Sequence, residues 1–172
     1  VDLLPGANCG GCGYAGCNAF AENVLKGDAP ITGCGPGGKE LVENLAKLLG
    51  VEMEEVVEMV AVTRCQGSPD KAADRFEYHG IEDCSVAHRT GAGHKACVYG
   101  CLGFGNCKIS CPFDAITMSE DKLPVVDENK CTGCGACVTA CPRDIMKLIP
   151  MTQQVYVGCV NPNKAKAVKS VC

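Results

Sequence analysis

Cysteine dominates this chain: 16 of its 172 residues are cysteine, and most stand in short runs with only two to five residues between them. Thiols this dense indicate either the disulfide framework of a secreted protein or metal sites in a reducing compartment. The spacing favours metal sites, because cysteines as close as Cys131 and Cys134 suit ligation of one metal centre. The opening VDLLPGANCGG is neither a signal peptide nor a long apolar run, so we expect a reducing interior.

The rest of the composition limits how the chain can fold and what it can do. It has no Trp, only 4 Phe and 4 Tyr, 21 Gly and 9 Pro, so a conventional core is hard to build. Metal ligation can supply the missing folding free energy. The net charge of −4 argues against a nucleic-acid partner, which would need a basic surplus. We recognise no catalytic residues and expect bound cofactors to carry the chemistry.

The segment KCTGCGACVTACPRD matches the C-x2-C-x2-C-x3-C-P run with which bacterial ferredoxins hold 4Fe–4S clusters. A second run, CVYGCLGFGNCKISCPFDAI, ends in the same way at a constant offset, which indicates an internal repeat. The repeat aligns Cys107, Cys111, Pro112 and Asp114 with Cys137, Cys141, Pro142 and Asp144. The first half of the upstream run is more widely spaced, so we expect a larger loop there.

Two such runs resemble the two-cluster module of bacterial ferredoxins, in which the fourth cysteine of each run binds the other cluster. The resemblance implies two ligand sets, numbered here as clusters 2 and 3. Between the runs, AITMSEDKLPVVD predicts two short strands around a polar turn. Structural zinc is the alternative, but it has no role for a tight third cysteine and a following proline. The implied ligands are Cys97, Cys101, Cys107 and Cys141 for cluster 2, and Cys111, Cys131, Cys134 and Cys137 for cluster 3.

The N-terminal segment ANCGGCGYAGC, followed by Cys34, carries a different four-cysteine pattern. Its stretch NAFAENVLKG predicts a helix that stops near Gly27 and returns the chain, so that Cys34 can join the first three thiolates. We expect two further amphipathic helices, over KELVENLAKLLG and EMEEVVEMVAVT. We prefer a 4Fe–4S cluster here, cluster 1, although zinc is harder to dismiss on spacing alone. Its expected ligands are Cys9, Cys12, Cys17 and Cys34.

The opening LLPGANCGGCGYAGCNAFAENVLKG, the later GCGPGG and both ferredoxin-like runs resemble the B subunit of the Rnf electron-transport complex. The resemblance covers nearly the whole chain and implies an iron–sulfur subunit on the cytoplasmic face of the cell membrane. It implies electron exchange with soluble ferredoxin, and partner subunits of an ion-pumping ferredoxin:NAD oxidoreductase. The resemblance implies a membrane-anchoring helix ahead of this opening, which we expect to be missing from this chain. The alternatives are a stand-alone polyferredoxin carrier and a non-redox zinc scaffold.

Four cysteines have no place in these sets: Cys65, Cys84, Cys159 and Cys172. We expect Cys65 and Cys84 to be small buried side chains, with a ligand role for either as the alternative. Cys172 resembles the first ligand of a further ferredoxin pair. The three histidines have no metal-like spacing.

The sequence therefore predicts an α+β protein with three 4Fe–4S clusters. A small helical N-terminal Fe–S domain (1–63) is followed by a connection (64–95). A bacterial two-cluster ferredoxin-like module (96–150) comes next, and then a tail (151–172) that is a possible start of a further module.

Overall fold

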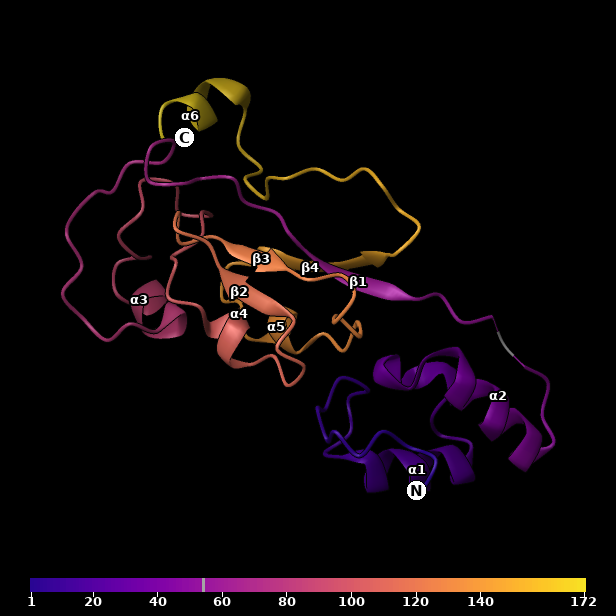
Figure 1. The fold of residues 1–172 in the computed structure, drawn as a ribbon. Coiled ribbons are helices and arrows are strands. Elements are labelled where there is room, and N and C mark those ends of the chain that lie inside the picture. Colours follow the sequence, from indigo (N-terminus) through magenta and orange to yellow (C-terminus); the bar gives the residue numbers. More distant parts are fainter. Residues whose placement is uncertain (54) are drawn as a thin grey trace.

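The computed structural model describes residues 1–53 and 55–172. It forms a small N-terminal lobe and a larger lobe that carries the short sheets (Figure 1). Short helices and strands alternate with long irregular loops, and this confirms the mixed helix and strand architecture. Within the described residues, no helix has both the length and the apolar composition needed to span a bilayer.

The N-terminal lobe contains two helices, α1 (Cys17–Lys26) and α2 (Gly38–Leu49), with two 3-10 turns between them, η1 (Ile31–Gly33) and η2 (Gly35–Gly37). As the sequence predicts, α1 ends at Gly27, which adopts a left-handed conformation with φ 81°. The two helices pack around a small hydrophobic core, in which Phe20 of α1 and Val42 of α2 are the most deeply buried side chains. Because this core is so small, it needs further support from the cysteine-rich loops that flank it.

The helix predicted over residues 52–63 is wrong. Residues 59–63 form strand β1 (Met59–Thr63), which pairs antiparallel with β4 (Met146–Pro150), and residue 54 lies outside the described part. The β-branched sequence MVAVT fits a pleated surface better than a helix, and Val60, Ala61 and Val62 are all buried. Strand β1 therefore joins the sheet of the larger lobe.

The internal repeat is visible in the larger lobe. Helix α4 (Asn106–Ile109) and strand β2 (Ile116–Met118) recur thirty positions later as α5 (Ala136–Thr139) and β4. Asp114 and Asp144, also thirty apart, both have positive φ, at 50° and 52°. Strands β2 and β3 (Pro124–Val126) form the predicted hairpin, with Ile116 opposite Val126.

The connection and the tail both wrap around this lobe. The connection contains one helix, α3 (Cys84–Arg89), and the tail ends in α6 (Ala165–Lys169) beside the start of the connection (Figure 1). Arg143, only 7% exposed, holds the end of the connection and the segment that follows it by donating hydrogen bonds to the carbonyl oxygens of Ala92, Cys97 and Gly100.

Candidate metal centres

Site 1, the expected location of cluster 1, is a chamber in the N-terminal lobe. All four expected thiols line it, together with Asn8, Phe20 and Pro36. The Asn8 Oδ1 accepts a hydrogen bond of 2.9 Å from the Cys17 backbone N–H, which fixes the loop against the start of α1. Burial raises the pKa of Cys34, and the neighbouring thiols of Cys17, Cys12 and Cys9 raise it further. The four thiols from Cys9, Cys12, Cys17 and Cys34 thus share one chamber.

Site 3, the expected location of cluster 3, lies beneath the β1–β4 sheet. Its chamber brings together all four expected thiols, from Cys111, Cys131, Cys134 and Cys137. Strand β1 closes one side, since the Ala61 N–H donates to the Cys131 Sγ at 3.4 Å. Burial raises the pKa of Cys137 to about 12, with the neighbouring thiols as the next cause.

A buried hydroxyl in site 3 has no partner. The Thr132 side chain lines the chamber, and its Oγ1 is buried without a hydrogen-bond partner within the described residues. A buried hydroxyl left unpaired is costly, and a cluster sulfur would satisfy it. Site 3 therefore fits a group that accepts hydrogen bonds.

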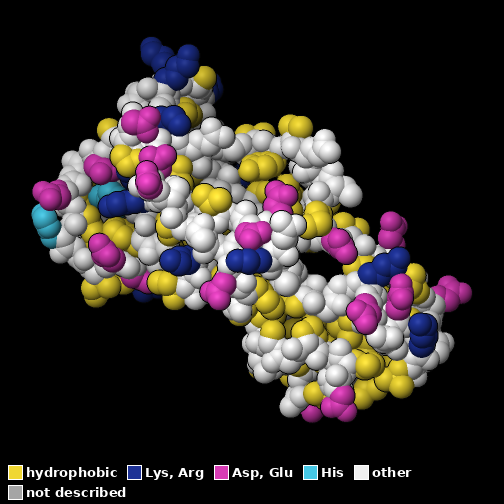
Figure 2. Space-filling view, viewed as in Figure 1, with side chains coloured by type: hydrophobic (Ala, Val, Ile, Leu, Met, Phe, Trp, Pro, Cys, Tyr) yellow, Lys and Arg dark blue, Asp and Glu magenta, His cyan; other side chains and the backbone are white. Residues whose placement is uncertain are grey.

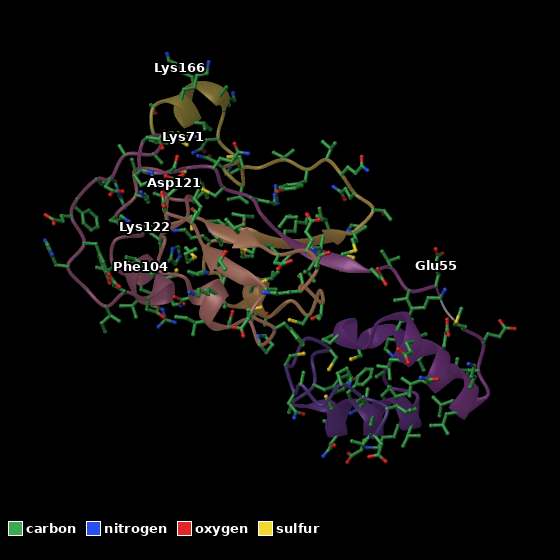
Figure 3. All side chains as sticks on the ribbon, in the orientation of Figure 1. Glu55, Lys71, Phe104, Asp121, Lys122 and Lys166 are labelled. Carbon is green, nitrogen blue, oxygen red and sulfur yellow. The ribbon has the colours of Figure 1, made fainter. Side chains whose placement is uncertain are left out.

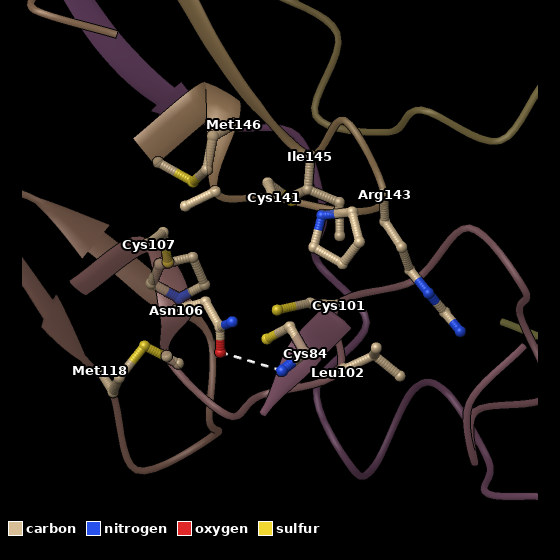
Figure 4. A pocket seen from close by; sticks show the side chains of 14 residues that line it. Cys84, Cys101, Leu102, Asn106, Cys107, Met118, Cys141, Arg143, Ile145 and Met146 are labelled. Carbon is tan, nitrogen blue, oxygen red and sulfur yellow. Dashed lines mark hydrogen bonds between the residues drawn. The ribbon is translucent and has the colours of Figure 1, made fainter. Parts of the chain in front are cut away.

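Site 2 differs from the expected ligand set. Three expected thiols, from Cys101, Cys107 and Cys141, line its chamber, and the fourth thiol there belongs to Cys84 (Figure 4). The expected fourth ligand, Cys97, points elsewhere: its Sγ accepts from the Asn161 Nδ2 at 3.5 Å. The reason is that Arg143 holds the backbone of Cys97, while α3 carries Cys84 inward.

Asn106 holds Cys84 at site 2. Its Oδ1 accepts from the Cys84 backbone N–H at 2.9 Å, the contact drawn in Figure 4, and its Nδ2 donates to Asp83 at 2.7 Å. Asp83 caps α3 by accepting from the Val86 N–H, which together with Asn106 lowers the pKa of Asp83. Sequence reasoning missed Cys84; the available signal was an N-cap aspartate directly before a cysteine, in EDCSVAH.

The thiols of site 2 are strongly desolvated. Burial raises the pKa of Cys101 to about 12 and that of Cys107 to about 11. For Cys107, the neighbouring thiols of Cys141 and Cys84, which line the same chamber, raise the pKa further. A site of this kind favours the bound metal over free thiolates, because the isolated charges would be costly to bury.

The three sites form a row. Sites 2 and 3 are linked by α4 and α5, which contact each other and carry Cys107 and Cys137. Sites 3 and 1 meet across a cleft between the lobes, where a hollow is visible in Figure 2. There a Cβ on Gly35 would lie 3.2 Å from the carbonyl oxygens of Thr132 and Gly133. Site 3 is therefore the middle member.

The donor set fits clusters better than single ions. Within residues 1–53 and 55–172, no three His, Cys, Asp or Glu side chains converge as ligands of one metal ion. A structural zinc needs four ligands on one centre at about 2.3 Å from sulfur. Four thiols that line one chamber instead suit a four-iron cluster, which has one thiolate per iron. All sixteen cysteines are free of disulfides.

Comparisons with known proteins define the class. Residues 4–36 match the family described as "Putative Fe-S cluster", and residues 96–149 match the "4Fe-4S dicluster domain". These two segments contain site 1 and most of sites 2 and 3. The chain is thus an iron–sulfur protein.

More particularly, the chain is similar over nearly its whole length to B subunits of ion-translocating oxidoreductase complexes, in keeping with the Rnf resemblance of its motifs. It is 49% identical over 98% of its length to the B subunit of the Na⁺-translocating ferredoxin:NAD⁺ oxidoreductase complex of Acetobacterium woodii. It is 46% identical over 99% of its length to the B subunit of the proton-translocating ferredoxin:NAD⁺ oxidoreductase complex of Clostridium ljungdahlii. It is 44% identical over 100% of its length to the B subunit of an ion-translocating oxidoreductase complex of Methanosarcina acetivorans. It spans 51% to 65% of the lengths of these relatives.

Proposed function

We propose that this chain is an electron-relay segment of a membrane-bound ferredoxin:NAD oxidoreductase that pumps ions. It exchanges electrons with soluble ferredoxin and passes them to other subunits on the cytoplasmic face of the membrane. The names of the Acetobacterium and Clostridium relatives support the ferredoxin and NAD parts of this proposal. Those two names carry different coupling ions, so the proposal leaves the ion open.

The observation that carries the proposal is the row of three thiol-lined chambers. We assign one 4Fe–4S cluster to each, held by the thiols that line sites 1, 2 and 3, with Cys84 in place of Cys97 at site 2. When bound, such clusters supply one-electron chemistry at potentials set by their surroundings. A row of sites in contact suits electron transfer from one end of the chain to the other.

The protein's own residues position and tune these groups. Backbone N–H groups reach thiol sulfurs, as Ala61 reaches Cys131, and hydrogen bonds to sulfur raise the potential by favouring the reduced state. The buried Thr132 hydroxyl adds a further donor at site 3. The sheet and the loops exclude water from Cys107 and Cys137, which are both buried.

We propose a direction for the relay from the order of the sites. Site 1 belongs to the lobe that the Rnf resemblance associates with the membrane, so it is the exit toward the partner subunits. Sites 2 and 3 receive electrons from ferredoxin.

The proposal is tested by anaerobic purification, metal analysis and titration with reduced ferredoxin. We expect at least about twelve irons per chain, from three four-iron clusters, and visible absorption that reduced ferredoxin bleaches. A colourless protein that contains zinc would contradict the proposal. A brown protein that reduced ferredoxin cannot reduce would contradict the donor assignment alone.

A further inference from the structure

Cys65 and Cys172 lie far apart in sequence but meet across one glycine. The Gly67 N–H donates to the Cys65 Sγ at 3.4 Å. A Cβ added to Gly67 would lie 3.5 Å from the Cys65 Sγ and 3.8 Å from the Cys172 Sγ. The two sulfurs therefore flank the same backbone position, on the connection and at the end of the tail.

Cys97 and Cys159 are joined in a similar way by one asparagine. The Asn161 backbone N–H donates to the Cys159 Sγ at 3.4 Å, and its side-chain Nδ2 donates to the Cys97 Sγ at 3.5 Å. Arg64 holds this part of the tail in place, because its guanidinium donates to the carbonyl oxygens of Val157 and Cys159.

These two pairs form one group. The segments of Cys65 and Cys159 are in contact, because Arg64 donates to the Cys159 carbonyl oxygen at 3.3 Å and a Cβ on Gly158 would lie 2.7 Å from the Gln66 Nε2. The Cys101 N–H, on the loop that begins at Cys97, donates to the Cys65 Sγ at 3.4 Å. The Lys71 ammonium is a cation close to the Cys172 thiol. Figure 3 shows Lys71 on the segment that passes beneath α6. Four thiols from three distant parts of the chain thus surround one place, with a cation beside them.

We infer that Cys65, Cys97, Cys159 and Cys172 bind a fourth 4Fe–4S cluster, at a place we name site 4. Cys97 is free for this role because Cys84 lines site 2 in its stead. The sixteen cysteines then divide into four sets of four. The inference rests on the proposed function only in taking iron–sulfur clusters as the groups that such sets bind.

The chemistry of site 4 fits a cluster. Its sulfurs accept three backbone N–H donors, from Gly67 and Cys101 to Cys65 and from Asn161 to Cys159, and such donors stabilise cluster sulfur. The Lys71 ammonium offsets negative charge. Cys159 and Cys172 are exposed, so this site lies at the protein surface.

Site 4 extends the row of sites. The Cys101 N–H, at site 2, donates to the Cys65 Sγ, at site 4, across 3.4 Å. Because site 2 is at the opposite end of the row from site 1, site 4 adds a surface-exposed member at the end where ferredoxin donates.

Iron counts on cysteine variants test the inference. In anaerobically reconstituted chain we expect about sixteen irons, from four four-iron clusters. Cys65→Ala, Cys97→Ala, Cys159→Ala and Cys172→Ala should each lose about four irons and the same reduced-state EPR signal. Cys84→Ala should lose about four irons but a different signal. Lys166→Ala, an exposed change on α6, is the control and should keep all iron.

Double variants separate a shared site from general damage. Cys65→Ala/Cys97→Ala should lose no more iron than either single variant, whereas Cys84→Ala/Cys97→Ala should lose about eight irons. The inference is overturned by a parent chain with about twelve irons whose content Cys65→Ala leaves unchanged. It is overturned equally by zinc at site 4, or by loss of the same EPR signal in Cys84→Ala and Cys97→Ala. A parent chain without iron would contradict the proposed function itself.

Discussion

Gly11 of the N-terminal lobe and Cys134 of site 3 are in direct backbone contact. A Cβ built on Gly11 would lie 2.9 Å from the Cys134 carbonyl carbon and would overlap its oxygen. Only glycine allows the loop of site 1 to approach site 3 so closely. Burial raises the pKa of the Cys134 thiol, and the nearby Cys9 thiol of site 1 raises it further. In the proposed relay, this contact joins the two lobes into one electron path.

Gly11→Ala should therefore push sites 1 and 3 apart without removing a ligand. We expect full iron content but slower electron transfer between the two sites, measured by rapid-mixing spectroscopy after reduction by ferredoxin. Gly13→Ala is the matched control, because it adds the same methyl group in the same loop where nothing lies within 4 Å. Since Gly13 has a φ of 85°, this control also reports any effect of backbone strain in the loop. Equal rates in the Gly11 variant, the Gly13 variant and the parent would show that the contact does not matter.

Thr132→Val should lower the reduction potential of site 3. The Thr132 hydroxyl has no other partner in the described structure, and as a donor to cluster sulfur it would stabilise the more negative, reduced state. One hydrogen bond is worth about 1 kcal/mol, which corresponds to about 40 mV for one electron. Potentiometric EPR titration would measure the shift. Thr139→Val, at an exposed residue of α5, should leave the potential unchanged. A shift of the same size in that variant would contradict the assignment of the Thr132 hydroxyl as a donor to the cluster.

Asn106→Ala should loosen site 2 through Cys84. It removes the two hydrogen bonds that fix Cys84 and Asp83, each worth about 1 kcal/mol. We expect chelators to extract about four irons per chain faster than from the parent protein, with the other iron unaffected. Asn129→Ala, at an exposed asparagine, is the control. Unchanged extraction from the Asn106 variant would mean that Cys84 does not serve site 2.

Iron retention should fall as the pH falls. Burial raises the pKa of Cys101 and Cys137 to about 12 and that of Cys107 to about 11, so protons compete with iron for these thiols throughout the neutral range. Below a thiol's pKa, each pH unit of acidification costs about tenfold in thiolate, so affinity is lost on the acid side. Chelator competition from about pH 9 to about pH 6 would measure this. Iron retention that stays constant or increases as the pH falls would contradict this prediction.

The features that depend on nearby residues could be predicted from the sequence. The cysteine spacing grouped the four thiols that line site 1, and Gly27 predicted the end of α1. The resemblance to two-cluster ferredoxins implied the four thiols that line site 3. The offset of the two runs predicted the repeated α4–β2 and α5–β4 units. Each of these features depends on residues within a few turns of chain, where spacing and turn chemistry are decisive.

The features that could not be predicted from the sequence depend on contacts between distant residues. Residues 59–63 read as part of a helix, but pairing of Met59 with Pro150 overrides that local pattern. Cys84 enters site 2 because Asn106, on another helix, binds its backbone. The position of Cys97 likewise depends on Arg143 and Asn161, both far along the chain. These contacts cannot be inferred from the spacing of cysteines along the sequence.

The most direct test of the relay removes its proposed exit. Cys12→Ala takes one thiol from site 1, which shares no cysteine with the other sites. The variant is placed in membranes that contain the whole complex, and two steps are measured: reduction of the remaining clusters by ferredoxin, and ferredoxin-dependent reduction of NAD⁺. We predict that the first step keeps its parent rate and that the second stops. Full ferredoxin-to-NAD⁺ turnover in this variant would show that site 1 lies off the path and would contradict the proposed relay.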